Sequence, residues 1–298
     1  MKLTLKKQAI LALCIVALSF SLLNVGVRML GTGFSPFTQV YLRTGLGLLL
    51  ISLIFHKELH PSKIQKISKK DWLILIAMGT LGYGIAVDFV TLGVLHTTLL
   101  NASVIGSTTP FFIMLFSIVF LRKSYPLSLL FFVLLTFYGI LVMATGSFMP
   151  VLNNFGIGDF FVLLYAAGVG VYIFGRKMLS THLNNSEIAW VVILVACVTA
   201  LVTAAFAGET LQLSGFLQPL ACAGFLMGGA LNVVATKLQN FSYPHLNPVI
   251  ASQLLLLTNV FALIFGYVFY HEIIQPVEFA GAVLVLMGVW ACIKQTAD

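Results

Sequence analysis

The chain has 298 residues, of which 60% are hydrophobic and only 8% are charged. A soluble domain carries about 25% charged residues, so this composition excludes a water-soluble globular protein. The apolar runs are continuous and approach the roughly 20 residues that a helix needs to cross a bilayer, whereas barrel strands alternate apolar and polar residues over about 10. We therefore predict an all-α integral membrane protein.

The basic residues and the cysteines exclude further kinds of partner. The net charge of +7 would suit nucleic-acid binding, but the lysines and arginines lie beside apolar runs, where they act as membrane-orientation signals. We therefore predict a lipid bilayer as surroundings and no nucleic-acid partner. No CxxC pair or histidine cluster is present, so we expect no disulfide, metal or cofactor from Cys14, Cys197, Cys222 and Cys292.

Ten apolar runs predict ten membrane-spanning helices. The first five are Gln8–Leu30, Pro36–Phe55, Asp71–His96, Leu99–Leu121 and Pro126–Ser147. After a polar linker at 149–158, the next five are Asp159–Phe174, Ile188–Ala207, Gly215–Thr236, Leu246–Tyr270 and Pro276–Ile293. The first run could be a signal peptide, but its length and the lack of a small-residue cleavage site favour a retained helix.

The basic residues also predict the topology. With the N-terminus in the cytoplasm, every lysine, together with Arg122 and Arg176, falls in an inside loop or tail, and only Arg28 and Arg43 fall within helices. Cytoplasmic loops are enriched in lysine and arginine. We therefore expect a multi-pass protein of the inner (plasma) membrane with both ends in the cytoplasm.

The chain contains the same stretch twice. A shift of 149 residues places Ala102, Ser103, Thr109, Phe112, Phe116, Val119, Phe120, Leu135 and Gly139 on Ala251, Ser252, Thr258, Phe261, Phe265, Val268, Phe269, Leu284 and Gly288. The interpretation is two five-helix repeats, at 1–148 and 156–298. Because five is odd, the repeats must be inverted in the membrane, which is the architecture of many secondary transporters.

The order and spacing of several short motifs resemble the drug/metabolite transporter superfamily of EamA type. These motifs are Asn24, Arg28, Ser35-Pro36, Tyr41-Leu42-Arg43, Pro110, Gly139, Gly158-Asp159, Arg176-Lys177, Glu272 and Gly288. The chain departs from that family at Lys123, Asp88 and Asn259. The resemblance implies a central substrate cavity lined mainly by helices one, three and four and by their partners six, eight and nine, with helices five and ten at the periphery.

Charged residues within the spans are the main candidates for a functional site, because charges in a membrane usually face a cavity. Arg43 either docks a carboxylate or phosphate or ties helix two to loop carbonyls. Asp88, with His96 two turns further along the same helix face, is our candidate for proton coupling and substrate contact. The alternative is a fixed ion pair of Asp88 with Arg28 or Arg43.

Uncharged polar and aromatic residues extend the predicted substrate site. A polar side chain at this depth needs a partner, which is either the substrate or a neighbouring helix. The polar candidates are Asn101, Asn232, Gln253 and Asn259, and the aromatic ones are Tyr83, Tyr165 and Tyr172. The small residues of helices six and eight fit packing within one chain, so we expect a monomer or a weak dimer.

Three functions remain open from the sequence. The first is a secondary transporter, more often an exporter, of a small polar or amphipathic metabolite such as an amino acid, by alternating access and with the proton as a candidate coupling ion. The second is a carrier of a nucleotide, cofactor or sugar-phosphate anion that uses Arg43 and Arg28. The third is a membrane enzyme or scaffold subunit, although no Walker loop, zinc motif or catalytic triad is recognisable, and we predict no catalytic residue.

Overall fold

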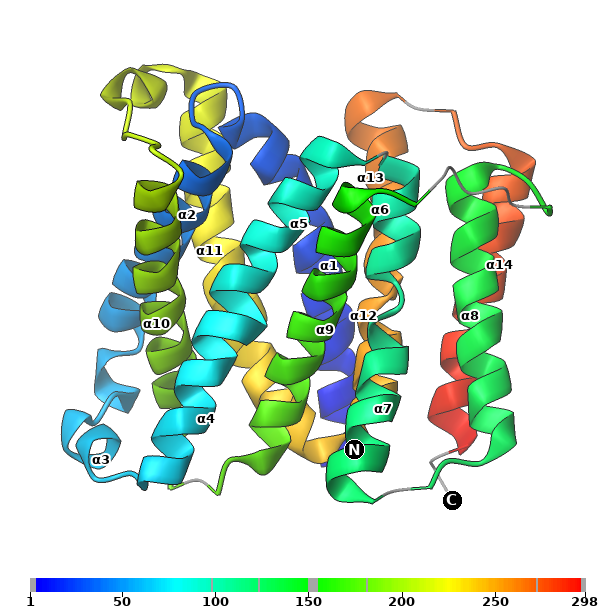
Figure 1. Cartoon of the computed structure of the whole chain (residues 1–298), viewed down its shortest axis with the longest axis horizontal. Coiled ribbons are helices and arrows are strands. Elements are labelled where there is room, and N and C mark those ends of the chain that lie inside the picture. Colours follow the sequence, from blue (N-terminus) through cyan, green and yellow to red (C-terminus); the bar gives the residue numbers. More distant parts are fainter. Residues whose placement is uncertain are drawn as a thin grey trace.

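The computed structural model describes residues 4–97, 99–122, 124–149, 155–180, 182–271 and 273–295, and every regular element in these ranges is helical. Ten helical segments are long and apolar enough to cross a membrane, which confirms the predicted number of spans. The bundle has one end, here called the terminal end, at which α1 (Leu5–Leu30) begins and α14 (Pro276–Gln295) finishes (Figure 1). Lys123 and Glu272 lie outside the described residues.

The first half of the chain supplies five spans. Its elements are, in order, α1, α2 (Pro36–Ile54), the 3-10 turn η1 (His56–Glu58), α3 (Pro61–Gln65), α4 (Lys69–Gly79), the π-helical turn η2 (Thr80–Gly84), α5 (Ile85–His96), α6 (Leu99–Gly106), α7 (Thr109–Leu121) and α8 (Leu127–Thr145). The third span is α4, η2 and α5 together, and the fourth is α6 with α7.

The second half supplies the other five. Its elements are α9 (Ile157–Met178), α10 (Asn185–Phe206), the 3-10 turn η3 (Leu213–Leu217), α11 (Pro219–Ser242), the 3-10 turn η4 (Tyr243–His245), α12 (Pro248–Leu255), α13 (Leu257–Tyr270) and α14. The ninth span is α12 together with α13.

The starts of three helices differ from the prediction because local capping decides them. Asn184 and Glu187 form a reciprocal capping box with two hydrogen bonds of 2.8 Å, so α10 begins three residues before the predicted Ile188. Asp159 is the third residue of α9 rather than its first. The predicted start of span eight at Gly215 is wrong, because η3 occupies that stretch and Pro219 takes the first helical turn of α11.

Spans four and nine were each predicted as one helix, but each is interrupted at its centre, between Gly106 and Thr109 and at Leu256. Pro110 lies in the first turn of α7, where its missing N–H and its ring favour a new helix start. Asn259 holds the equivalent place in span nine, and its side-chain amide donates to the carbonyl of Leu256 at 3.1 Å. Such a local side-chain bond competes with the helical ladder, which accounts for the break.

Several contacts join positions of the two halves in a reciprocal way. A Cβ on Gly139 of α8 would lie 2.8 Å from the carbonyl oxygen of Gly281 and from the nitrogen of Val285 in α14. A Cβ on Gly288 of α14 would in turn meet Phe132 and Thr136, which lie 149 residues before Gly281 and Val285. The same contact is therefore made twice with the halves exchanged, as in an isologous interface.

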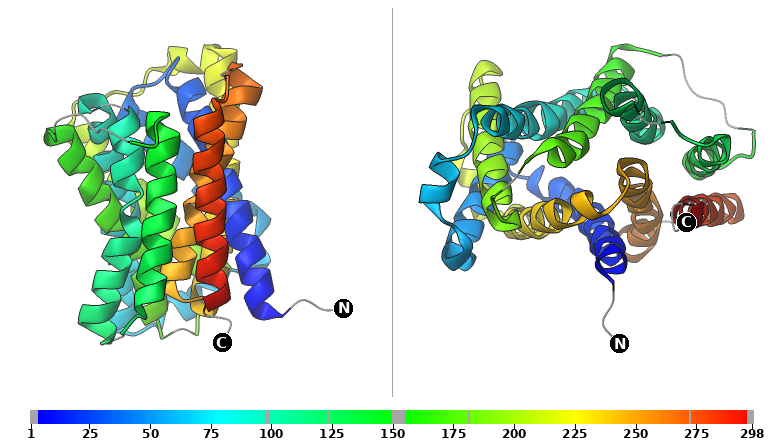
Figure 2. Two further views of the ribbon diagram at one scale, coloured as in Figure 1. Left: turned by 90° about the vertical axis from the view of Figure 1, so that its right-hand side faces the viewer. Right: turned by 90° about the horizontal axis from the view of Figure 1, so that it is seen from below.

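The helices divide into a peripheral pair and a central group. α8 and α14 lie beside each other at one side of the bundle, as the view from below in Figure 2 shows. In the central group, α1 packs along α11, α5 packs along α9, and α2 packs along α10 and α11. This arrangement brings polar residues of α2, η2, α5, α9 and α11 toward the middle of the molecule.

Candidate functional site

Charged and polar side chains from four spans meet inside the bundle. Arg43 of α2 is buried and lies within electrostatic range of Tyr83 in η2, Asp88 in α5 and Tyr165 in α9. The hydroxyl of Tyr83 donates a short hydrogen bond to the Oδ1 of Asn232 in α11. We call Arg43, Tyr83, Asp88, Tyr165 and Asn232 the interior cluster. All five were predicted as site residues, and the structure brings them together.

The π-helical turn places Tyr83 within this cluster. Gly82 lets the turn approach α9 closely, since a Cβ at this position would lie 3.0 Å from backbone atoms of Tyr172. π-turns are rare and occur frequently at functional sites. Tyr83 and Asn232, which the turn brings together, are 149 residues apart, and this is the shift at which the sequence resembles itself. Two positions separated by the spacing of the predicted repeat therefore contact each other here.

Polar atoms of three members of the cluster lack hydrogen-bond partners. Both carboxylate oxygens of Asp88, the Nε of Arg43 and the Nδ2 of Asn232 are buried without a hydrogen bond. Thr203 of α10 lies beside Asp88, and its hydroxyl is also within hydrogen-bond distance of the carbonyl of Ala200, at 3.1 Å. Asp88 takes no part in the two ion pairs found among the described residues, His60–Glu187 and Lys237–Glu58, so the predicted alternative of a fixed ion pair is not seen.

An unpartnered buried polar group costs about 1–3 kcal/mol, and more when it is charged, so such groups are rare unless a ligand or water completes them. Tyr83 and Tyr165 lie deep in the protein, yet both retain accessible surface. Their rings are therefore not fully covered by other protein atoms. The cluster can therefore accept a ligand that supplies a cation to Asp88 and an anion to Arg43.

A second group of polar contacts extends from the cluster to the terminal end. The Tyr172 ring lies 6.5 Å from that of Tyr83 between centroids, and its hydroxyl accepts a hydrogen bond of 3.3 Å from Asn240 in α11. Arg176 of α9 donates to the carbonyl of Asn240 at 3.0 Å and to the Oδ1 of Asn185 in α10 at 3.1 Å. This chain of contacts ties α9, α10 and α11 together below the cluster.

The remaining predicted site residues lie elsewhere. Asn101 donates at 3.4 Å to Asp159, whose carboxylate caps α9, so it belongs to a helix-end network. His96 is exposed at the end of α5. Asn259 joins α13 to the break in span four through Ser103 and Ser107.

Gln253 of α12 is fully buried, and both of its amide atoms lack partners. Its helix α12 contacts α9, which carries Tyr165, but no hydrogen bond joins Gln253 to the interior cluster. It stays a candidate from the sequence, without support from the geometry.

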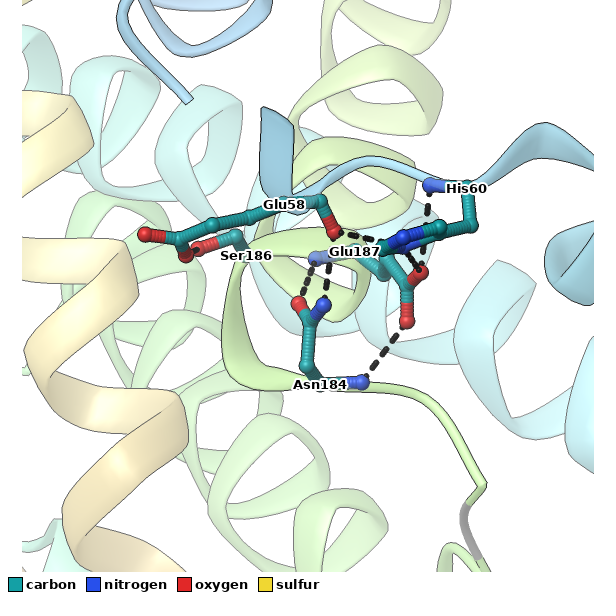
Figure 3. Close-up of polar contacts among 5 residues, drawn as sticks. All are labelled: Glu58, His60, Asn184, Ser186 and Glu187. Atoms are coloured by element: carbon teal, nitrogen blue, oxygen red, sulfur yellow. Dashed lines mark hydrogen bonds and ion pairs between the residues drawn. The ribbon is translucent and has the colours of Figure 1, made fainter. Parts of the chain in front are cut away.

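Two carboxylates at the ends of α10, which the sequence analysis did not single out, bind α2 and the segment that follows it. At the end opposite the termini, Glu209 accepts hydrogen bonds from the backbone of Phe37 at 3.2 Å and of Thr38 at 2.6 Å, and so caps α2. At the terminal end, Glu187 of α10 accepts from the nitrogen of His60 at 3.1 Å and lies 3.0 Å from its Nδ1 (Figure 3).

Glu58 adds a further link at the terminal end. Its carboxylate accepts a short hydrogen bond from Ser186 (Figure 3) and pairs with Lys237 of α11 at 3.1 Å. The hydroxyl of Ser186, followed by the ammonium of Lys237, lowers the pKa of Glu58 below its ordinary value. Because the lowered pKa reflects stabilisation of the charged form, this contribution is present at neutral pH and is lost as the pH falls through the lowered pKa.

Among the described residues, no group of three or more histidine, cysteine or acidic side chains is placed to hold a metal ion. A solved crystal structure has the same fold, with a TM-score of 0.79, 13% identity and coverage of 96% of each chain. The model of the EamA-like transporter family matches twice, at residues 7–145 and 156–293. The chain belongs to the EamA-like transporter family. This confirms the resemblance seen in the sequence.

Two relatives match this EamA-like transporter along most of its length. It is 24% identical over 296 residues to the pseudopaline exporter CntI of Pseudomonas aeruginosa (strain UCBPP-PA14), with 98% of this chain and 97% of the relative covered. It is 27% identical over 262 residues to the uncharacterized transporter sll1164 of Synechocystis sp., with coverage of 82% and 71%. The protein is thus a multi-pass membrane transporter, and its relatives include a pseudopaline exporter.

Proposed function

We propose that the protein exports a small zwitterionic metabolite, such as an amino acid, by alternating access. The observation that carries this proposal is that both carboxylate oxygens of Asp88 and the Nε of Arg43 are buried without a hydrogen bond in one interior cluster. A zwitterion presents an ammonium and a carboxylate together. It would bind Arg43 through its carboxylate and Asp88 through its ammonium group. A pure anion would leave the buried Asp88 carboxylate without a cation and would be repelled by it.

The neighbouring side chains fit the rest of such a substrate. Arg43 offers a planar set of donors suited to a carboxylate. Asn232 holds a free amide donor beside the hydroxyl of Tyr83, and the half-buried rings of Tyr83 and Tyr165 lie in the same cluster. Tyrosine supplies an apolar face with a polar tip, which suits an amphipathic substrate. The similarity to a pseudopaline exporter supports outward movement of a metabolite.

The two halves of the chain supply the conformational change in this proposal. We take 1–148 and 156–298 as two inverted five-helix repeats, supported by the reciprocal contacts of α8 with α14 and by the Tyr83–Asn232 pair. In many secondary transporters one repeat rocks against the other around a midplane site. The contacts of Arg176 with Asn240 and Asn185 would hold the terminal end closed and would break when that end opens.

The membrane orientation follows from the basic residues and is part of the proposal. The loop between α2 and α4 carries Lys57, Lys63 and Lys66, and the terminal end is therefore assigned to the cytoplasm of an inner (plasma) membrane. The substrate would enter from this side. We propose a monomer as the transporting unit, with a weak dimer as the alternative, since both halves of the site lie in one chain.

Asp88 is proposed to exchange its bound partner with a proton during the cycle. A carboxylate without hydrogen bonds in a membrane interior can bind either a substrate ammonium or a proton. We expect Asp88→Asn to remove the pH dependence of transport, because the amide cannot be protonated. The measurement is initial flux in proteoliposomes across a series of pH values, with Glu278→Gln as a control carboxylate away from the cluster. Parallel pH profiles for the parent and Asp88→Asn would contradict this role.

The substrate class is tested by a screen. Cells that overproduce the protein are compared with cells that overproduce Arg43→Gln, by mass spectrometry of metabolites in the medium and by growth with toxic amino-acid analogues. Zwitterionic metabolites are expected to accumulate outside only in the parent cells, and counterflow in proteoliposomes should reproduce the result. Selective movement of phosphorylated sugars or nucleotides would instead favour the anion carrier, and no flux of any metabolite would overturn the proposal.

A further inference from the structure

An apolar groove runs along the outside of the bundle near the terminal end. Its volume is about 520 Å³, and it lies between α2, α11 and the first residue of α10. Its walls are formed by side chains such as Leu50, Ile54, Val233 and Leu238, and Lys237 and Asn185 are its polar members. The groove is separate from the interior cluster.

The groove faces the hydrocarbon of the membrane. Ile54 and Val234 line it and are 62% and 43% exposed, and Leu53 and Leu226 on the same two helices are also exposed. In a membrane-spanning chain, such side chains contact lipid. The occupant that this surface meets at the highest concentration is therefore an acyl chain, which can fill a narrow apolar groove between two helices.

The polar end of the groove carries the ammonium group of Lys237. The Nζ of Lys237 lies 3.3 Å from the centre of the Phe55 ring and 3.1 Å from the Oε2 of Glu58. Behind Asn185 lies Arg176, which takes part in neither ion pair of the described residues. Lys237 and Arg176 thus lie at the same end of the bundle as Glu58 and as Glu187, which pairs with His60. The Glu58 carboxylate is 49% exposed, and exposed ion pairs contribute only about 0–1 kcal/mol, so a competing anion can displace it.

From these observations we propose that the groove binds one anionic phospholipid of the leaflet at the terminal end. Its acyl chain would lie between α2 and α11, and its phosphate would contact Lys237. Basic pockets between membrane helices are known to bind anionic headgroups. The lipid would then brace α2 against α10 and α11 at the end of the bundle where Arg176 joins α9, α10 and α11. This inference depends only on membrane insertion and holds whatever the substrate is.

The test is thermal unfolding of the purified full chain in detergent, with dioleoyl phosphatidylglycerol or dioleoyl phosphatidylcholine added as mixed micelles. Phosphatidylglycerol is expected to raise the melting temperature more than phosphatidylcholine. Lys237→Gln should weaken apparent binding of phosphatidylglycerol roughly fivefold, because a basic residue near an anionic lipid contributes about that factor. The two lipids should then raise the melting temperature by similar amounts.

A groove-filling variant separates the groove from general lipid effects. Ala230 lines the groove and is exposed, so Ala230→Trp fills it without entering the core. Leu226→Trp is the matched control, one helical turn away on the same lipid-facing side of α11 and outside the groove lining. Ala230→Trp should lose the response to phosphatidylglycerol, and Leu226→Trp should keep it. Equal responses of the parent to both lipids, equal responses of the two tryptophan variants, or a dimer in native mass spectrometry that only Ala230→Trp dissolves would each overturn the proposal.

Discussion

Replacing Arg43 by glutamine is expected to reduce transport of the substrate roughly ten- to a hundredfold at concentrations below saturation. A hydrogen bond to a charged group contributes about 1.5–3 kcal/mol, and 1.4 kcal/mol corresponds to a factor of ten. Arg43 is buried near Asp88, Tyr83 and Tyr165. It is the one arginine of the interior cluster, so no other member can supply a guanidinium in its place. The measurement is the initial rate of uptake into proteoliposomes as a function of substrate concentration.

Two further variants give this prediction its controls. Arg43→Lys keeps the charge but loses the planar fork, so it should transport at an intermediate rate. Arg28→Gln changes an exposed arginine outside the cluster and should transport like the parent. A well-folded Arg43→Gln protein that transports normally would contradict the proposed site. Equal losses in Arg43→Gln and Arg28→Gln would favour the two-arginine anion carrier.

Gly158→Ala is expected to have the largest effect on stability among the glycine substitutions in the first turns of helices. A Cβ at Gly158 would lie 2.7 Å from the nitrogen of Thr97 and closer still to the carbonyl of His96, and backbone atoms cannot move aside easily. The added methyl group would push the start of α9 away from α5, where Asp159 accepts hydrogen bonds from Thr97 and Asn101. Overpacking of this kind costs about 1–3 kcal/mol or more.

The matched control is Gly106→Ala at the end of α6, where the nearest atoms to a new Cβ would be 3.8 Å away. Alanine is the better helix former by about 1 kcal/mol in a helix interior, so this variant should unfold at the same temperature as the parent or slightly above it. Thermal unfolding in detergent compares the two. If Gly158→Ala unfolds at the temperature of Gly106→Ala, the close approach of α9 to the end of α5 is not as described.

The spans could be predicted well from the sequence, because each is a long apolar run. The positions of the lysines and arginines provided an independent check on the number of spans. The interruptions of spans four and nine could not be predicted from the apolar pattern of the sequence. Leu256 is apolar and no proline marks its break, which depends instead on a side-chain bond from Asn259. The start of α10 could have been found from the capping pair Asn184 and Glu187. The prediction placed it at Ile188 instead, because it followed the apolar run, which begins there.

Part of the candidate site could likewise be predicted from the sequence, and part could not. Arg43 and Asp88 could be found because a charge inside an apolar run is conspicuous. The contact of Tyr83 with Asn232 depends on a π-helical turn, which has no signal in the periodicity of side chains. Glu58, Glu187 and Glu209 bind partners more than 100 residues away in the chain, and their roles depend on packing that a single sequence does not reveal.

The most direct measurement is thiol labelling of Tyr165→Cys, in a chain whose cysteines at 14, 197, 222 and 292 are replaced by alanine. A membrane-impermeant maleimide is applied to right-side-out and to inside-out vesicles, with Ser62→Cys and Thr210→Cys as controls for the two ends of the bundle. A carrier whose interior cluster opens to each side in turn predicts labelling of position 165 from both sides, with each control labelled from one side only. Labelling of position 165 from a single side would contradict alternating access around this cluster.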